Sequence, residues 1–376
     1  MELKLNVVIP VGCLDRIQDY PKRLKNLFRR LEEARGIAVS ELNDFNVVFH
    51  VGVLNPLSFP DWEKKTHKVT RGLPKEHWNT YQYYTFNRES FMYMLLDKGV
   101  LDGENDYVTF IDDDDCVSKD YFKSFRRDFK PECEAIYRTD AHEVDLINKR
   151  ERLLRENDHN GTLSSLYQNF TDMKTTFQIW GNFFPMKVVK RMFEDLRGIK
   201  FRGMWEDLVY WSYMVSKYDY PVVQTGGTYY YMVRENQNSL SRGTGPIRRI
   251  RRLSENLALA KEILAKSGKN NFDLGWLEVQ AYLIALESVS DIMEIGTAKV
   301  TRPSFFDDFE EVMEILTSIE VTKKLQKGWS KKFFKSTRRA YGGIKVRKLF
   351  DQRIGSKEKC NYLTPALLED LKGILE

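Results

Sequence analysis

The sequence has few cysteines and no long apolar run. Its four cysteines have no CxxC spacing, which excludes a disulfide scaffold or a cysteine-rich zinc site and fits a reducing compartment; they are Cys13, Cys116, Cys133 and Cys360. No apolar stretch approaches the roughly 20 residues that span a bilayer. The first residues, MELKLNVVIPVG, lack the basic start and long apolar stretch of a secretory signal. We therefore expect a cytoplasmic protein.

Several common catalytic motifs are absent as well. The five histidines show no HxxxH or HxH spacing, so zinc chemistry is not expected. The chain contains no GxxxxGK(S/T), GxGxxG or GxSxG sequence. These absences remove the usual support for Walker-type ATPases, GxGxxG dinucleotide-binding proteins and serine hydrolases.

The composition indicates a folded protein with an uneven charge. The 376 residues are 42% apolar and 30% charged, which is enough apolar material for a sizeable core. From Val321 to Lys359 there are 14 Lys and Arg against 2 acidic residues, although the whole chain has a net charge of only +5. For residues 323–353 the alternatives are an anionic membrane surface, a solvated helix face or nucleic acid. We favour the membrane surface and expect no nucleic acid partner.

Strand-like and helix-like stretches alternate in the first half of the chain. Leu5–Pro10, Phe45–Leu54 and Tyr107–Ile111 are short apolar runs that predict buried strands. Between them, Arg16–Ala34 and Arg88–Leu101 have the apolar spacing of helices. This alternation predicts an α/β protein with a parallel, doubly wound sheet. Because ligands bind at the carboxyl ends of such strands, residues 10–16 and 112–115 should share one rim.

The second half is less regular. No element is assigned between Glu134 and Thr176. Helices are predicted from Lys187 and from Trp205 to Val215, and residues 221–234 are predicted to form two strands turned at the glycine pair 226–227. Beyond Thr244 long helical periods replace the strand signals, at 253–264 and 274–295. We therefore predict one domain over residues 1–244 and a helical, basic domain over 245–376.

Two acidic motifs suggest chemistry. Asp112–Asp115 are four consecutive aspartates, whose mutual repulsion favours a bound divalent cation. The alternative is a solvated turn that caps the next helix. Glu206 and Asp207 are adjacent carboxylates at an expected helix start, where one of them is a candidate general base. Here too the alternative is helix capping.

The order of five motifs resembles the inverting nucleotide-sugar glycosyltransferases of family 2, which have the GT-A fold. The matching segments are VVIPVG (7–12), FNRESF (86–91), YVTFIDDDDCVSKDYF (107–122), FRGMWEDLVYW (201–211) and YYYMVRENQNSLS (229–241). They cover roughly residues 5–242. The FNR and WED segments are also similar to the family 7 galactosyltransferases. The resemblance implies a GT-A sheet with flanking helices.

The resemblance also implies roles for individual residues. The nucleotide would be bound by Pro10, Val11, Arg16 or Arg23, Arg88, Asp112 and Asp113. Asp114, together with Asp112, would hold the Mn²⁺ or Mg²⁺ that bridges the two phosphates. Asp207 would remove the proton from the acceptor hydroxyl. Glu206 or Trp205 would position the acceptor. Trp180 is a further predicted acceptor-binding residue.

Two positions depart from the family pattern. The aspartate that usually follows the second strand and reads the base is absent from FHVGVLNP, which leaves a backbone group or Asn55 for that role. The late loop has Asn236 where many members have a histidine that sometimes binds the metal.

The resulting hypothesis is an enzyme that transfers a hexose or N-acetylhexosamine from a UDP-sugar to a glycan acceptor with inversion. The expected setting is bacterial surface polysaccharide, capsule or lipooligosaccharide synthesis at the inner face of the membrane. One alternative is a metal-dependent nucleotidyltransferase. The other is a non-catalytic module that binds nucleic acid through the basic segment.

Overall fold

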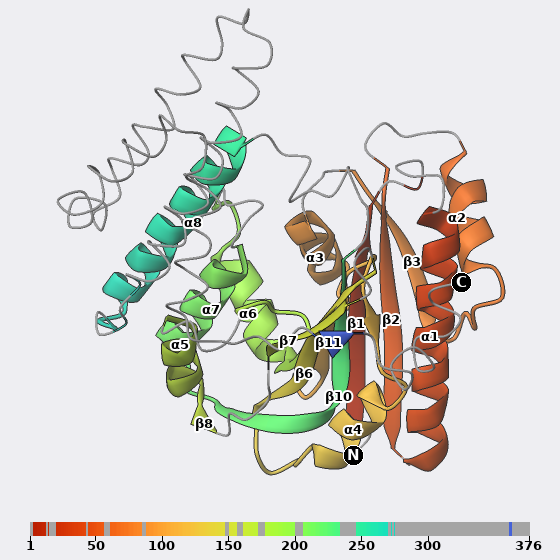
Figure 1. The fold of residues 1–376 in the computed structure, drawn as a ribbon, viewed down its shortest axis with the longest axis horizontal. Coiled ribbons are helices and arrows are strands. Elements are labelled where there is room, and N and C mark those ends of the chain that lie inside the picture. Colours follow the sequence, from red (N-terminus) through yellow and green to blue (C-terminus); the bar gives the residue numbers. More distant parts are fainter. Residues whose placement is uncertain are drawn as a thin grey trace, which may run out of the picture.

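A computed structural model describes the chain in several ranges. They are residues 3–12, 14, 20–42, 44–55, 61–84, 88–146, 150–155, 161–171, 177–199, 206–233, 246–269, 272, 274 and 361–362. Figure 1 shows a central sheet with helices on both sides, which confirms the predicted α/β class. The basic segment 323–353 and most of the predicted helix 274–295 lie outside the described residues.

Four parallel strands form the first half of the sheet, in the order β3-β2-β1-β4. They are β1 (Leu3–Val11), β2 (Phe45–Leu54), β3 (Trp78–Tyr83) and β4 (Tyr107–Phe110). Both neighbours of β1 are paired in register with it, Val7 lying opposite Phe49 of β2 and Thr109 of β4. The three predicted strands are therefore confirmed, and β3 is an additional one.

The second half of the sheet is mixed. β9 (Asn182–Pro185) is antiparallel to β4, and β6 (Ile136–Asp145) is antiparallel to β9. β10 (Pro221–Val233) runs parallel to β6. Short strands complete the sheet: β5 (Cys116–Val117), β7 (Arg150–Arg155), β8 (Gly161–Thr162) and β11 (Asn361–Tyr362). The unassigned region between Glu134 and Thr176 therefore contains sheet strands.

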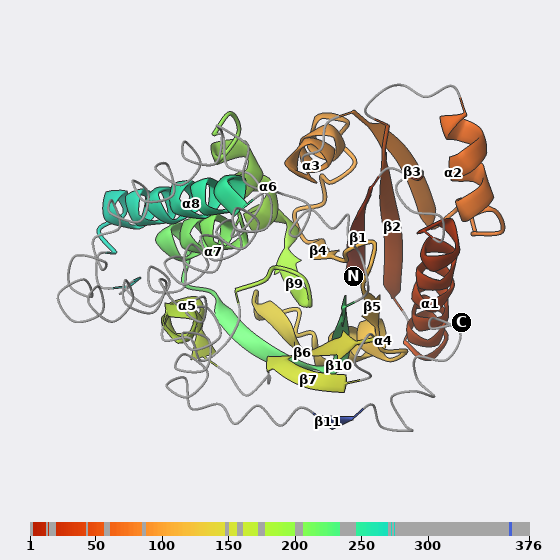
Figure 2. The same cartoon turned by 45° about the horizontal axis from the view of Figure 1, so that its top comes forward.

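Helices cover both faces of the sheet. On one side lie α1 (Tyr20–Glu41), α2 (Trp62–Thr70) and α4 (Tyr121–Asp128). On the other lie α3 (Arg88–Asp97), α5 (Leu163–Thr171), α6 (Met186–Asp195), α7 (Glu206–Lys217) and α8 (Pro246–Lys266). Figure 2 gives the same arrangement from a second angle, with α1 and α2 far from α5–α8.

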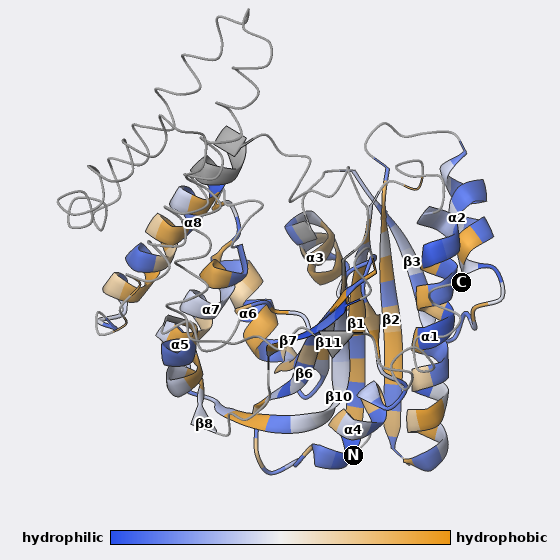
Figure 3. Ribbon diagram, viewed as in Figure 1, coloured by the Kyte–Doolittle hydropathy of each residue, from blue (hydrophilic) through white to orange (hydrophobic). Residues whose placement is uncertain are grey.

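Two apolar cores result from the alternation of side chains along the strands. Val7 and Ile9 of β1 pack in the core under α1 and α4, whereas Val8 packs in the core under α3, α6 and α7. In Figure 3, β2 is apolar along much of its length and α2 is mostly polar. Because both faces of the parallel strands are buried, they are apolar runs rather than alternating ones.

Residues 221–233 form one continuous strand, so the predicted pair of strands was wrong. The glycine pair produces a bulge, with a shift of register between Gln224 and Thr228, after which β10 continues parallel to β6. Gly227 has a φ of +83°, and a Cβ there would lie 2.9 Å from the Cα of Tyr121. The backbone therefore passes α4 so closely that only glycine fits.

The helix α8 packs on α7. Its residues Leu257, Ala260 and Leu264 belong to the same apolar core as Trp211 of α7. The predicted domain boundary near Thr244 falls outside the described residues. Within the part of the chain that the structure describes, no helix has both the length and the apolarity needed to cross a bilayer.

Candidate active site

The carboxyl ends of β1 and β4 lie next to each other in the sheet. The chain proceeds from β1 outward to β2 and β3, and then returns to the opposite side of β1 as β4. The segments that follow β1 and β4 therefore emerge side by side at the carboxyl ends of two neighbouring parallel strands, which is where ligands bind in open α/β sheets. The backbone N–H of Gly12, just after β1, donates to Asp113 Oδ2 at 2.8 Å. This contact confirms the predicted shared rim at Gly12 and Asp113; Cys13 and residues 15–16 lie outside the described part of the chain.

The four aspartates have different surroundings. Asp113 accepts hydrogen bonds from Gly12 N–H and from the Tyr20 hydroxyl of α1. The Tyr20 hydroxyl in turn accepts from Gly12 N–H at 2.8 Å. Asp113 therefore connects the end of β1, the start of α1 and the acidic turn. Its predicted contact with the ribose stays a prediction.

Asp115 is the most buried of the four, with 2% of its surface exposed. Its carboxylate accepts hydrogen bonds from the Tyr229 hydroxyl at 2.8 Å and from Met232 N–H at 3.0 Å. Burial, followed by the charges of Asp114 and Asp112, raises its pKa well above the usual range. Sequence reasoning missed this residue as a member of the site. The only local signal is that Asp115 directly precedes the apolar pair of β5.

Three of the carboxylates lie close together. Asp112, Asp114 and Asp115 each offer an oxygen, and these oxygens lie within 4.8 Å of one another. Hard divalent cations such as Mg²⁺ and Mn²⁺ prefer carboxylate oxygens. A cation would also relieve the repulsion that burial of Asp115 intensifies. The donor set therefore fits a divalent cation, and the predicted pair Asp112 and Asp114 is in it.

A pocket opens beside the acidic turn. It is lined by Val8, Pro10, Glu89, Phe91, Met92, Phe110, Asp112, Ile179, Trp180, Phe193, Glu206 and Tyr210. Four predicted site residues are therefore brought together from β1, the acidic turn, the turn before β9, and α7.

The first turn of α7 carries both predicted catalytic carboxylates. Glu206 lines the pocket, and Asp207 is the next residue of the helix and is half-buried. A helix N-terminus stabilises negative charge in its first turn. Tyr210, one turn further on, donates its hydroxyl to Glu89 Oε1 at 3.0 Å. Burial, with the charges of Glu89, Glu206 and Asp207, raises the pKa of Tyr210 well above its usual range.

Trp180 is held rigidly in the pocket wall. Its ring stacks on Tyr229, with centroids 4.5 Å apart, and on Tyr231 at 5.8 Å. The turn that carries it is closed by Asn182, whose side-chain amide donates to the carbonyls of Ile179 and Trp180 at 2.9 and 3.0 Å. Tyr229 therefore contacts both the acidic turn and the aromatic wall.

Other predicted residues lie elsewhere or are not described. Val11 is fully buried in the core under α1, beside the pocket residue Pro10. Asn55 is buried at the end of β2, where its N–H donates to the Tyr83 carbonyl at 2.8 Å. Arg23 is half-buried on α1. Arg16, Trp205, Asn236 and the side chain of Arg88 lie outside the described part of the chain.

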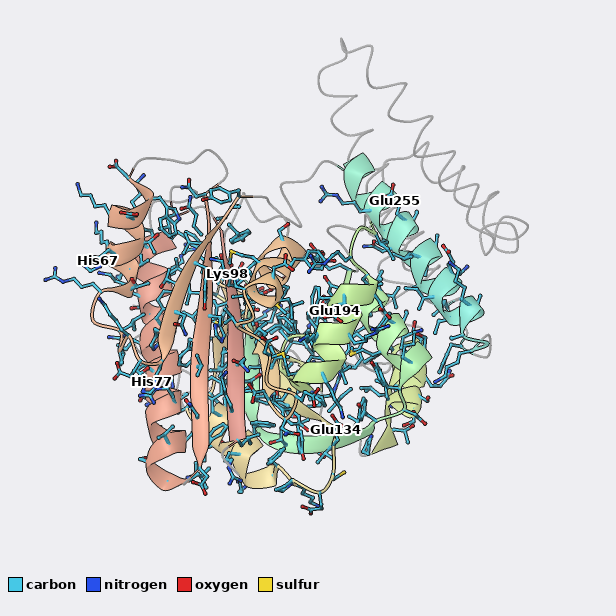
Figure 4. All side chains as sticks on the ribbon, turned by 180° about the vertical axis from the view of Figure 1, so that it is seen from behind. His67, His77, Lys98, Glu134, Glu194 and Glu255 are labelled. Atoms are coloured by element: carbon cyan, nitrogen blue, oxygen red, sulfur yellow. The ribbon has the colours of Figure 1, made fainter. Side chains whose placement is uncertain are left out.

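Sequence reasoning also missed Glu89. It follows Arg88 in the FNRESF segment, so its position in a resembling motif was the available signal. The structure places it in the first turn of α3, with 3% of its surface exposed. In Figure 4, which views the molecule from behind, His67 and His77 lie well away from Glu194 on the opposite side.

Comparison with known proteins gives only distant likenesses. No protein-family model matches the chain, and no curated protein sequence matches it significantly. Among solved structures, it is similar to residues 1–349 of TarS from S. aureus in complex with UDP-GlcNAc, at 14% identity and a TM-score of 0.45, over 86% of this chain and 92% of that one. It is similar to the mannosyltransferase PcManGT from Pyrobaculum calidifontis in complex with GDP-Man and Mn²⁺, at 10% identity and a TM-score of 0.44, over 93% and 87%.

A further likeness is to the inositol-1-phosphate CTP transferase from T. maritima. The identity is 13% and the TM-score 0.39, over 70% of this chain and 98% of that one. At these identities and TM-scores, none of the three structures assigns a function to this chain.

Proposed function

We propose that this protein is a metal-dependent, inverting glycosyltransferase that moves a hexose or N-acetylhexosamine from a UDP-sugar to a glycan acceptor. The observation that carries the proposal is the convergence on one pocket of Asp112 from the acidic turn and Glu206 from the start of α7. The transfer needs an acidic turn that would hold a cation, here at the carboxyl end of β4, and a carboxylate base beside it, here in the first turn of α7 where Asp207 follows Glu206. The resemblance in motif order to family 2, and in part to family 7, supports the same reaction.

The donor would be bound at the carboxyl ends of β1 and β4. Pro10 lines the pocket and Val11 lies beside it, so this strand end would contact the nucleotide base, with Asn55 or a backbone group reading it. Asp113 would approach the ribose, and Arg16 or Arg23, with Arg88, the diphosphate. Asp112 and Asp114, with Asp115, would hold Mn²⁺ or Mg²⁺. When bound, the ion neutralises charge on the leaving nucleoside diphosphate.

The acceptor would approach from the side of α7. Asp207 would take the proton of the acceptor hydroxyl at a carboxylate oxygen, and Glu206 would orient that hydroxyl. Trp180 presents an immobile aromatic ring in the same pocket, and Trp205 would assist it. Attack from the face of the sugar opposite the diphosphate is a single displacement and inverts the anomeric carbon.

The cellular setting is a separate part of the proposal. We place the reaction in surface polysaccharide, capsule or lipooligosaccharide synthesis, at the cytoplasmic face of the membrane. The excess of basic residues over 323–353 supports an anionic membrane surface as partner. In this view residues 1–244 are the catalytic domain and 245–376 a helical domain that attaches it to the membrane.

The decisive experiment measures release of UDP. The protein is incubated with UDP-glucose, UDP-galactose, UDP-GlcNAc and UDP-GalNAc, with Mn²⁺ or with EDTA. We expect Mn²⁺-dependent release from one donor, and a loss of at least about 100-fold in Asp114→Ala. Asp102→Ala is the matched control, because Asp102 is exposed and paired with Lys190.

Three outcomes would contradict the proposal. Release that persists in EDTA would remove the role of the metal. Release of pyrophosphate from a nucleoside triphosphate, without UDP release, would indicate a nucleotidyltransferase instead. Absence of any nucleotide binding, together with salt-dependent binding to nucleic acid, would indicate a non-catalytic module.

A further inference from the structure

The segments that contain α1 and α2 are basic. Residues 20–41 and 61–77 together contain 11 Lys and Arg against 6 Asp and Glu. The rest of the chain, leaving out 321–359, has the opposite balance, with 34 Lys and Arg against 46 Asp and Glu. These two helices therefore carry positive charge on a body that is otherwise acidic, and this contrast does not depend on the basic segment 323–353.

The exposed basic residues of the two helices follow the helical repeat. On α1 they have the spacing i, i+3, i+7, and on α2 the spacing i, i+4, with a further one at the residue that ends the helix, so each set lies on one side of its helix. Together they form what we call the basic surface, and all six of its members are exposed: Lys22, Lys25, Arg29, Lys64, Lys68 and Arg71.

The two helices that carry the basic surface are neighbours. Val69 of α2 belongs to the same apolar core as Leu27 of α1, and the two helices are in contact. Figure 1 shows them side by side at one edge of the molecule, and Figure 2 shows the same from the second angle. The six residues therefore form one surface rather than two separate patches.

The acidic residues of α1 do not neutralise the basic surface, because all three form ion pairs with other residues. The pairs are Glu32 with Arg35, Glu33 with Lys119, and Glu41 with Lys123. On α2, Glu63 lies in the first turn, where the helix dipole favours a carboxylate. Among the residues that the structure describes, five members of the basic surface make no ion pair: Lys22, Lys25, Lys64, Lys68 and Arg71.

The basic surface begins near the rim that carries the acidic turn. Tyr20, the first residue of α1, donates its hydroxyl to Asp113. Lys22 and Lys25 follow within the next turn and a half of the same helix. A partner that covers the basic surface would therefore lie close to the carboxyl ends of β1 and β4.

The chemistry of the basic surface indicates an extended anionic partner. Four of its six members are lysines, whose flexible point charges require no fixed geometry in the partner, unlike the planar fork of arginine. Neither helix has an exposed Tyr, Phe or Trp, which stacking on nucleic acid bases would use. Lipid headgroups offer a plane of diffuse negative charge, and such a plane also repels the acidic remainder of the chain.

We propose that the basic surface of α1 and α2 docks on an anionic membrane and holds the rim of the sheet close to it. This inference goes beyond the proposed sugar transfer and does not rest on it. It also names a membrane contact other than segment 323–353.

The test measures sedimentation of the full-length protein with phosphatidylcholine vesicles that either contain or lack phosphatidylserine. The first variant removes three charges of the basic surface, and the second keeps them in another form. They are Lys25→Gln/Lys64→Gln/Lys68→Gln and Lys25→Arg/Lys64→Arg/Lys68→Arg.

A third variant is the control for net charge. It removes three exposed lysines from α7, α8 and the residue that follows α3, all on the opposite face of the sheet. Figure 4 labels one of them, Lys98. The variant is Lys98→Gln/Lys217→Gln/Lys266→Gln.

We expect wild type to bind the anionic vesicles, more weakly as salt is added, and to bind the neutral vesicles poorly. Each basic residue near an anionic bilayer strengthens binding about fivefold. The glutamine variant of the basic surface should therefore bind the anionic vesicles roughly 10-fold or more weakly, whereas the arginine variant and the control should stay near wild type. Release of UDP in solution should be the same in all four proteins.

Several results would overturn the inference. They are equal weakening in the control, unchanged vesicle binding in the glutamine variant of the basic surface, and equal binding of wild type to neutral vesicles. If that variant instead loses affinity for double-stranded DNA while its vesicle binding is unchanged, the surface serves nucleic acid and the membrane role is wrong. A wild type that docks through these lysines but releases no UDP from any donor would refute the sugar transfer and leave the membrane contact intact.

Discussion

Removing one oxygen atom, in Tyr229→Phe, should loosen the acidic turn without disturbing the core. The phenol oxygen of Tyr229 accepts a hydrogen bond from Asp112 N–H at 3.1 Å and donates one to Asp115 Oδ2 at 2.8 Å. Phenylalanine keeps the ring that stacks on Trp180. The substitution therefore tests the two hydrogen bonds and little else.

The expected loss of stability in Tyr229→Phe follows from the hydrogen bonds that the substitution removes. Asp115 keeps the bond from Met232 N–H but loses one of the two bonds to its buried carboxyl. A buried polar group that loses its partner costs about 1–3 kcal/mol, and this substitution removes two hydrogen bonds. We expect the free energy of unfolding to fall by about 2–4 kcal/mol in EDTA. We also expect affinity for Mn²⁺ to weaken by roughly 10-fold or more, as for other residues that support metal ligands.

The assays are urea denaturation in EDTA and calorimetric titration of Mn²⁺ in the presence of UDP. Tyr137→Phe is the matched control: Tyr137 is also buried, and its hydroxyl accepts Lys130 N–H at 2.9 Å, in a bond that includes none of the aspartates. The control should lose stability and keep the wild-type affinity for Mn²⁺. If Tyr229→Phe also binds Mn²⁺ as tightly as wild type, Tyr229 does not hold the metal site in place.

Two further predictions concern stability. Burial and the charge of Lys4 lower the pKa of His50 from 6.5 to about 4, so between these values the unfolded chain binds a proton that the folded chain does not. The free energy of unfolding should fall by up to about 3 kcal/mol as the pH falls from 6.5 to 4, and urea titrations should show a smaller fall in His50→Gln. Gly227→Ala should lower stability by at least about 1–3 kcal/mol, because of its positive φ and the nearby backbone. Gly36→Ala, in open space on α1, should raise it by about 0.5–1 kcal/mol, and thermal melts of both variants are the measurement.

Opposite results would contradict these arguments in different ways. An unchanged pH slope in His50→Gln would mean that another group titrates in that range. A Gly227→Ala protein as stable as wild type would mean that β10 shifts away from α4 at little cost. A destabilised Gly36→Ala would show that the α1 surface at this position is not open.

Local sequence patterns predicted much of the first half of the fold. Residues 5–10, 45–54 and 107–111 are apolar runs because both faces of the parallel strands are buried, and the structure has strands there. The shared rim of residues 10–16 and 112–115 was also predictable, because Pro10 ends one of these runs and Asp112 directly follows another. Glu206 was selected from a motif and lines the same pocket as these two residues, as does Trp180, which was predicted as an acceptor-binding residue.

The features that could not be predicted depend on contacts between residues that are far apart in the sequence. Four adjacent aspartates look alike in sequence, and only partners on β10 make Asp115 the buried one. Glu89 and Tyr210 lie far apart in the chain but line the same pocket, where the Tyr210 hydroxyl donates to Glu89. The glycine pair of β10 has the composition of a hairpin turn. Pairing with β6 on both sides of the bulge overrides that local preference.

The dependence of Asp115 on β10 sets a condition on the order in which the protein folds. Its two hydrogen-bond donors, Tyr229 and Met232, follow it by 114 and 117 residues. Contacts over such separations form late, because the closure of a long loop must precede them. During synthesis the parallel strands β1–β4 are complete while the acidic turn still lacks its anchor. A chain that stops before β10 would therefore contain most of the sheet without a competent metal site, so activity should appear only when the last long strand has been added.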